Sequence, residues 1–308
     1  MKFKIFFLLA ILSFHFSCSN LPEYKNIIKD TPRDNSYWEL MIKKSKKENI
    51  SILNSIKIQN PSLYNQIIKD ANDSIVLTFW GQSLNFDSGA KSQIVDDQII
   101  ADLHAAFGLH NDGKIVHAGV THTYGYLFSV LDTPYGYKRE RWIGPAMNKA
   151  FSLKGQSLSP EAENGGFLSN VTYFTGMFAF KNTRDRLALR KLNNVSDEIK
   201  NFKDDSLTIV HLEEVLLDFT LRTTLVKLPM KDSASENEYL LIYSILNHKF
   251  DKELLITTFL ITNNAYTKII APQSLGDNQP IVIRYNAFIN GLMDRNLSGK
   301  RKLWSEKG

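Results

Sequence analysis

The sequence predicts an α+β fold, in which N-terminal helices are followed by a mostly antiparallel β-sheet with a C-terminal strand meander. Apolar residues recur at helical spacing in segments before residue 108, whereas strand-length apolar runs follow one another from Leu207 onward. Breaks at Asp251 and at Asn263-Asn264 favour hairpins between neighbouring antiparallel strands. The strands expected in this part cover residues 207–212, 215–228, 238–247, 253–262, 266–271 and 281–289.

The part of the chain before Leu207 mixes helical and strand patterns. Helices are expected from Trp38 onward, after Pro61, over residues 94–107, and over residues 139–151 with an interruption near Gly144-Pro145. Strands are expected over residues 74–80 and 170–180, because β-branched and aromatic residues are enriched there. The whole chain has 308 residues, which is ample for a large core.

The N-terminus has the order of an export signal: basic, then apolar, then small. Lys2 and Lys4 precede an apolar run over residues 5–12, and Ser17 stands directly before Cys18. The apolar run is about half of the roughly 20 residues that a membrane-spanning helix needs, so residues 1–17 are expected to be a signal peptide. Cys18 is the only cysteine of the chain.

This arrangement over residues 1–18 resembles the signal of bacterial lipoproteins, whose cysteine is lipidated and becomes the first mature residue. The resemblance implies a membrane anchor such as palmitate on Cys18 and a lipidated tether over residues 18–36. It places the protein in the bacterial cell envelope, and the uncharged Ser19 favours the outer membrane. Residues 37–294 then form one globular domain, in which a boundary could fall near residue 205, and residues 295–308 are expected to be a frayed tail.

Charge and cysteine content narrow the range of functions. Removal of residues 1–17 takes away Lys2 and Lys4 and lowers the formal net charge from +5 to +3, which gives no reason to expect a nucleic-acid partner. If Cys18 carries lipid, no cysteine is left for a disulfide, a thiolate nucleophile or a zinc site built on cysteine.

Four histidines lie close together in the sequence: His104, His110, His117 and His122. Between them, Asp112-Gly113 is a strong signal for a two-residue hairpin turn, which would place His110 opposite Ile115 and Gly108 opposite His117. Histidines on one face of such a hairpin could bind a divalent metal such as zinc. The residues expected to ligate the metal are His104, His110 and His117.

The same histidines could instead act as general acids and bases without a metal, since imidazole titrates near neutral pH. In this mechanism, the residues with an expected catalytic role are His117, His122 and Asp112. A third interpretation is structural, with the histidines packing and capping strand edges.

Two Tyr-Gly-Tyr units and a pair of arginines follow the histidines. Glycine lets the backbone approach a ligand, tyrosine offers an apolar face with a polar tip, and arginine can pair with a carboxylate or phosphate. These properties suit a pocket for a sugar, a peptide or an acidic small molecule. The expected ligand-binding residues are Tyr124, Tyr126, Tyr135, Tyr137, Arg139 and Arg141.

The sequence therefore supports two functional hypotheses. The first is an envelope-anchored lipoprotein that binds a small molecule or a partner of the envelope or of a host. The alternative is a metal-dependent or histidine-dependent envelope hydrolase that uses the segment from His104 to His122.

Overall fold

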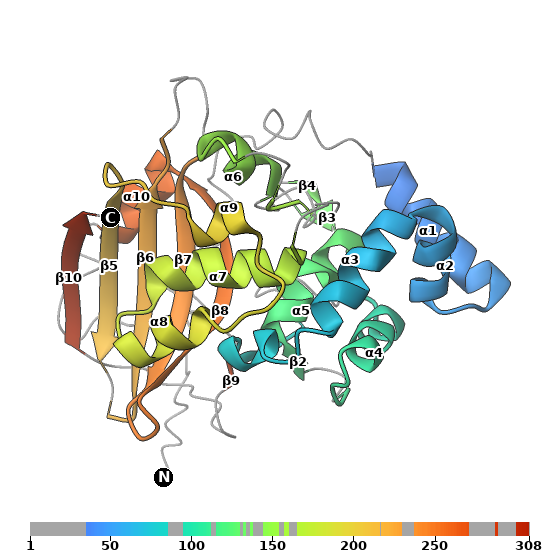
Figure 1. Cartoon of the computed structure of the whole chain (residues 1–308), viewed down its shortest axis with the longest axis horizontal. Coiled ribbons are helices and arrows are strands. Elements are labelled where there is room, and N and C mark those ends of the chain that lie inside the picture. The colour runs from blue at the N-terminus through green and yellow to red at the C-terminus, as the bar shows by residue number, and fades with distance from the viewer. Residues whose placement is uncertain are drawn as a thin grey trace, which may run out of the picture.

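The computed structural model confirms the α+β fold, with helices toward the N-terminus and antiparallel sheets toward the C-terminus (Figure 1). It describes residues 35–85, 95–111, 115–129, 132–133, 136–137, 144–153, 157–159, 165–215, 217–229, 237–270, 287–288 and 300–307. None of the helices in these ranges is long and apolar enough to cross a membrane.

A five-stranded antiparallel sheet in the order β10-β5-β6-β7-β8 forms one side of the molecule (Figure 1). Its strands are β5 (Thr208–Val215), β6 (Phe219–Lys227), β7 (Asn237–Asn247), β8 (Lys252–Thr262) and β10 (Lys300–Lys307). The four strands from β5 to β8 confirm the predicted meander. Asp251, with φ 44°, supplies a left-handed residue in the turn between β7 and β8.

The prediction of a strand over residues 266–271 is wrong, because residues 266–270 lie in the helix α10 (Asn263–Ile270). Tyr266 of α10 stacks on Tyr239 of the sheet, with ring centroids 4.0 Å apart. The helix covers part of the sheet face that points away from the other helices (Figure 1). An apolar run of this length fits a short helix as well as a strand.

Within the predicted frayed tail, residues 300–307 form β10, which pairs with β5 along its whole length. The register places Arg301 opposite Glu214 and Lys302 opposite Glu213. Opposite charges in such cross-strand positions favour pairing, and lysines are common on edge strands.

The helical part begins with three helices: α1 (Asn35–Glu48), α2 (Ile52–Gln59) and α3 (Pro61–Ala71). Ser51 and Asn60 cap α2 and α3 with their side-chain oxygens, and Pro61 opens α3 as predicted. The predicted helix over residues 94–107 is confirmed as α4 (Asp97–Ala106), with Asp96 as its cap.

Both strands predicted in this part are wrong. Residues 76–79 form the short 3-10 helix η1 (Val76–Phe79), and residues 167–179 form the helix α7 (Phe167–Ala179). Because α7 is buried on nearly every side, its sequence shows no polar face that would reveal the helical period. Its threonines fit the helix because their hydroxyls donate to backbone carbonyls one turn earlier, as Thr172 does to Leu168 at 2.6 Å.

The remaining elements are short. The helices are α5 (Ala118–Thr123), η2 (Gly125–Phe128), α6 (Gly144–Ala150), α8 (Thr183–Leu189) and α9 (Asp197–Lys200). The strands are β1 (Gln82–Leu84), β2 (Ile115–His117), β3 (Asp132–Thr133), β4 (Gly136–Tyr137) and β9 (Ala287–Phe288). A small antiparallel sheet has the order β2-β1-β9, and β3 pairs with β4.

Helix α7 lies at the centre, between the N-terminal helices and the large sheet (Figure 1). It contacts α3, α5 and η1 on one side and β6, β7 and β8 on the other. The indole of Trp80 donates to the hydroxyl of Thr172 at 2.8 Å, which ties η1 to this helix. Buried residues from both parts form one continuous hydrophobic cluster.

Asp70, in the last turn of α3, is fully buried and caps the N-terminus of α7. Its carboxylate accepts hydrogen bonds from the backbone N–H groups of Leu168 at 2.6 Å and Ser169 at 3.2 Å, and from the hydroxyl of Ser169 at 3.0 Å. The hydroxyl of Tyr124 is a fourth donor. A Cβ at Gly166 would overlap this carboxylate, so only glycine leaves room for the approach.

Arg222 of β6 occupies the corresponding place at the C-terminus of α7. It is 5% exposed and donates to the carbonyl of Ala179 at 3.2 Å. The same guanidinium binds Glu253 at 2.5 Å and Glu213 at 2.8 Å, and the hydroxyl of Ser244 donates to Glu253 at 2.5 Å. The buried arginine therefore links three strands to the end of the helix.

We expect Tyr124→Phe to lower the free energy of unfolding by about 1–3 kcal/mol, because Asp70 loses one hydrogen-bond donor. The site is fully buried, so water cannot take the place of the missing hydroxyl. Urea unfolding measured by circular dichroism tests this. Tyr64→Phe is the matched control, since Tyr64 is only partly buried and the substitution keeps its ring. Equal stabilities of the two variants would contradict the expectation.

Candidate functional site

The predicted site residues that the structure describes belong to the stretch of sequence from α4 to β4. His104, His110, His117, His122, Tyr124 and Tyr126 are described with their side chains, and Tyr137 only as a backbone position in β4. The remaining predicted residues, Cys18, Asp112, Tyr135, Arg139 and Arg141, lie outside the described residues.

The hairpin predicted around Asp112-Gly113 is not supported by its flanks. Residues 108–111 are not a strand, and β2 pairs with β1, so that His117 is opposite Gln82 rather than Gly108. Helix α4 ends at Ala106, and Gly108 behind it has φ +63°, which lets the N–H of Leu109 reach the carbonyl of His104 at 2.8 Å. His110 therefore sits in an exposed connection and not opposite Ile115.

His104 is buried, and His117 is half-buried. His104 is 2% exposed in the last turn of α4. The pKa of His117 is lowered to about 4, mainly by burial. A hydrogen bond with the backbone of Leu77 raises this pKa, and the nearby His104 lowers it. His117 is thus a neutral imidazole at pH 7, and its basicity is low for a general base.

The predicted metal triad is not assembled. Within the described ranges, which include His104, His110 and His117, no group of three histidine, cysteine, aspartate or glutamate side chains is placed to hold a metal ion. Zinc needs three or four such ligands at one point. The described geometry therefore gives no basis for zinc at these histidines.

Tyr124 and Tyr126 belong to the same Tyr-Gly-Tyr unit but have opposite surroundings. Tyr124 is 0% exposed, and its ring packs edge-on against Phe167 with centroids 5.6 Å apart. Burial raises the pKa of Tyr124, and so do the charge of Asp70 and the hydrogen bond to it. Tyr124 is therefore a core residue and does not border a solvent-facing site, contrary to the predicted role.

His122 and Tyr126 form an aromatic pair at the surface of the helical part. Their ring centroids are 4.9 Å apart, the rings are inclined by 48°, and both side chains are partly exposed. The neighbours Thr121, Thr123 and Tyr124 are buried, so the pair stands on a packed base. Of the predicted ligand-binding and catalytic side chains that are described, these two combine mutual contact with access to solvent.

The sequence reasoning missed the buried polar groups around Asp70. Asp73 accepts hydrogen bonds from the backbone N–H groups of Asn193 at 2.9 Å and Asn194 at 3.1 Å. A signal was present for Asp70, because it follows Leu63 and Ile67 on one stripe of α3, which makes it an acid at a core position.

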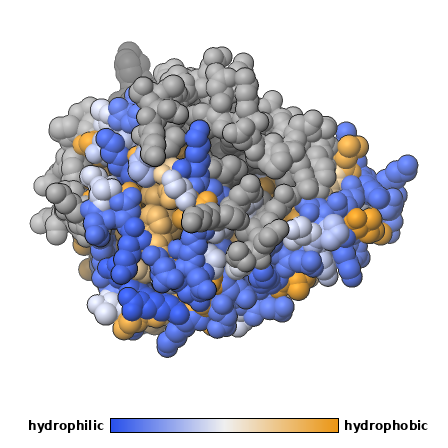
Figure 2. Space-filling view, turned by 45° about the horizontal axis from the view of Figure 1, so that its top comes forward, coloured by the Kyte–Doolittle hydropathy of each residue, from blue (hydrophilic) through white to orange (hydrophobic). Residues whose placement is uncertain are grey.

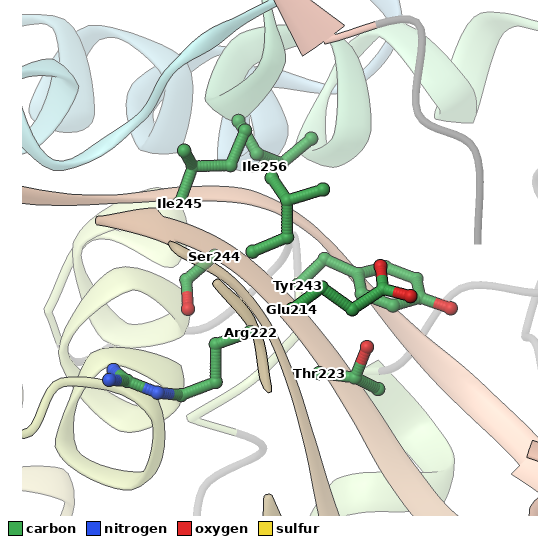
Figure 3. A pocket seen from close by; sticks show the side chains of 8 residues that line it. Glu214, Arg222, Thr223, Tyr243, Ser244, Ile245 and Ile256 are labelled. Carbon is green, nitrogen blue, oxygen red and sulfur yellow. The ribbon is translucent and has the colours of Figure 1, made fainter. Parts of the chain in front are cut away.

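A small cavity lies within the large sheet (Figure 3). Its polar lining residues come from both faces of the sheet. Arg222 and Ser244 point to the side of α7, whereas Glu214, Thr223 and Tyr243 point to the other side. The lining residues are Glu214, Leu221, Arg222, Thr223, Tyr243, Ser244, Ile245 and Ile256. Its volume of about 10 Å³ has room for a single water and not for a small-molecule ligand.

Comparison with known proteins gives no assignment. No protein-family model matches the chain, and no curated protein and no solved structure is significantly similar to it.

The pKa shifts of Asp70 and His117 have opposite effects on how the free energy of unfolding changes with pH. Burial raises the pKa of Asp70 to about 6, while its four hydrogen bonds limit the rise. Its contribution is therefore present below the usual value of 3.8 and is lost as pH rises through about 6. The contribution of His117 is present above its usual 6.5 and is lost as pH falls through about 4.

We expect these two effects to cancel in the pH dependence of the wild-type free energy of unfolding, so that each is measurable only in a variant that lacks the other group. Asp70→Asn should lose stability more steeply than the wild type as the pH falls from 6.5 to 4. His117→Gln should instead gain stability relative to the wild type on the same acidification. Each difference should reach about 3 kcal/mol. Urea unfolding at several pH values measures both, and unchanged profiles in both variants would refute the assigned pKa shifts.

Proposed function

We propose that this chain is an envelope-anchored binding lipoprotein. Lipid on Cys18 holds it at a bacterial membrane, with the outer membrane favoured, and residues 18–36 tether the folded domain. The domain binds a small molecule or a partner of the envelope or host. Support for the anchor comes from the order of basic, apolar and small residues before the single cysteine.

The observation that carries the binding function is the His122–Tyr126 pair. The two rings lie 4.9 Å apart beside a buried layer and are half-buried, so they place aromatic surface at a fixed position. Tyr124, which lies between the two residues in sequence, is fully buried and donates a hydrogen bond to Asp70, so the backbone of this segment is held in place. Such a surface suits the face of a sugar ring or an apolar side chain of a peptide.

The alternative of an envelope hydrolase has less support. A histidine mechanism needs an imidazole that exchanges protons near neutral pH, whereas burial lowers the pKa of His117 to about 4. Of the two acids that could assist a histidine, Asp112 lies outside the described residues. The other, Asp102 of α4, accepts hydrogen bonds from the backbone N–H of Ile52 at 2.6 Å and from the side chain of Gln98 at 2.9 Å. We therefore keep binding as the proposed function.

The anchor is tested with Cys18→Ser. We expect the variant to lose labelling by radioactive palmitate and to move from the detergent phase to the aqueous phase in a phase-partitioning experiment. The matched control is Ser19→Ala, which changes the adjacent residue and keeps the sulfur. Unchanged labelling of Cys18→Ser would remove the lipoprotein assignment.

The binding surface is tested by following the ring protons of His122 and Tyr126 by nuclear magnetic resonance. We titrate N-acetylglucosamine oligomers and, separately, short peptides of alanine and glutamate. One class should shift both rings, and His122→Ala or Tyr126→Ala should weaken binding about tenfold, which corresponds to the loss of one ring contact.

Tyr124→Phe is the control within the same Tyr-Gly-Tyr unit, because its ring is buried. It should lower stability and leave the affinity unchanged. The assignment of this surface fails if neither probe class shifts the rings, or if Tyr124→Phe weakens binding as much as Tyr126→Ala.

A further inference from the structure

Large apolar side chains are exposed together at one end of the five-stranded sheet. This end, called here the hairpin end, comprises the β5–β6 turn, the β7–β8 turn and α8, which lie at the lower end of the sheet in Figure 1. Leu217 is 92% exposed in the first turn, and Phe250 is 53% exposed in the second. Leu187 of α8 and Val215 at the end of β5 are 52% and 43% exposed.

Hydrogen bonds connect the three segments of the hairpin end. The backbone N–H of His248 donates to the carbonyl of Asp218 at 3.0 Å, and its ring contacts the hydroxyl of Thr220 at 2.8 Å. On the other side, Arg184 of α8 donates to the carbonyl of Phe250 at 2.9 Å. The apolar side chains are therefore presented by one connected unit.

Cations occur in the same segments as these apolar side chains. Arg184, Arg186 and Lys249 are exposed, and the register of β10 places Lys300 opposite Val215 at the same end of the sheet. Asp218 and Asp251 are exposed acids in the two turns, and Arg184 lies 4.0 Å from both Asp185 and Asp251. Arg186 and Lys249 therefore carry most of the positive charge available to a partner at this end. An anionic surface would complement this charge.

Exposed leucine and phenylalanine at protruding turns, with lysine and arginine beside them, are the features of a protein surface that inserts shallowly into a lipid interface. The apolar groups leave water for the acyl boundary, while the cations are attracted to anionic headgroups. We propose that the hairpin end docks the folded domain on an anionic lipid surface. This contact goes beyond the proposed anchor and does not depend on lipid at Cys18.

A second exposed apolar pair lies at the opposite end of the molecule. Leu40 of α1 is 60% exposed and Ile58 of α2 is 62% exposed, and Figure 2 shows hydrophobic patches at the end where these helices lie. Two such side chains stand here against four at the hairpin end. Lys46 of α1 pairs with Asp96 at 2.8 Å, while Lys43, Lys47 and Lys57 are exposed. This end therefore also carries cations but has half as many exposed large apolar side chains. This pair therefore serves as the matched control.

The experiment uses the unlipidated mature chain, residues 18–308 with Cys18→Ser. This change removes no described residue, since the described structure begins at Asn35. Binding is measured by sedimentation with vesicles of phosphatidylcholine alone and of an equal mixture of phosphatidylcholine and phosphatidylglycerol. We expect binding to the anionic vesicles that added salt weakens.

The double variant Leu217→Ser/Phe250→Ser should bind these vesicles at least about tenfold more weakly, because two large apolar groups no longer enter the interface. Arg186→Gln/Lys249→Gln should reduce the preference for anionic over neutral vesicles. Leu40→Ser/Ile58→Ser should bind like the wild type. Circular dichroism melting curves verify that every variant is folded.

Three outcomes would overturn the proposal. They are an absence of wild-type binding to anionic vesicles, an equal loss in the Leu40→Ser/Ile58→Ser control, and a dimer in light scattering that Leu217→Ser/Phe250→Ser dissociates. The dimer would assign the hairpin end to a second copy of the chain. Palmitate labelling at Cys18 is read separately, so failure of this contact and failure of the anchor are distinguishable.

Discussion

Helix α7 is held between two buried charges of opposite sign, and the rest of the fold is arranged around it. Asp70 accepts the first free N–H groups of the helix, and Arg222 donates to the carbonyl of Ala179 at its end. Both charges have the sign that the helix dipole favours at their end. Because Asp70 belongs to α3 and Arg222 to β6, the helix joins the N-terminal helices to the sheet.

This arrangement explains why burying these charges is tolerated. A buried carboxylate is costly unless its oxygens are satisfied, and Asp70 has four donors around it. Arg222 is compensated by Glu213 and Glu253. Replacing one partner would leave the other charge buried without its counterpart, so the groups are coupled and their contributions are not additive.

Much of the fold could be predicted from the sequence, and the most consequential error concerns α7. The strands β5 to β8 were recognisable because their apolar runs are separated by short breaks. The sequence of α7 predicts a strand, because threonine and aromatic residues are typical of strands. A helix that is buried on nearly every side also has no polar face that would indicate the helical period. What distinguishes the two conformations is the carboxylate of Asp70, almost a hundred positions earlier in the chain.

The candidate site shows the same limit at the scale of single residues. Tyr124 and Tyr126 are equivalent in sequence pattern, but one is buried against Phe167 and the other is partly exposed beside His122. A local pattern identifies an unusual segment without stating which side chain faces the core. That choice follows from where α5 and η2 pack against α7 and α4, which again depends on how α7 is held. The position of the His122–Tyr126 pair therefore depends on how Asp70 and Arg222 hold α7, and residues outside the segment of the pair determine it in part.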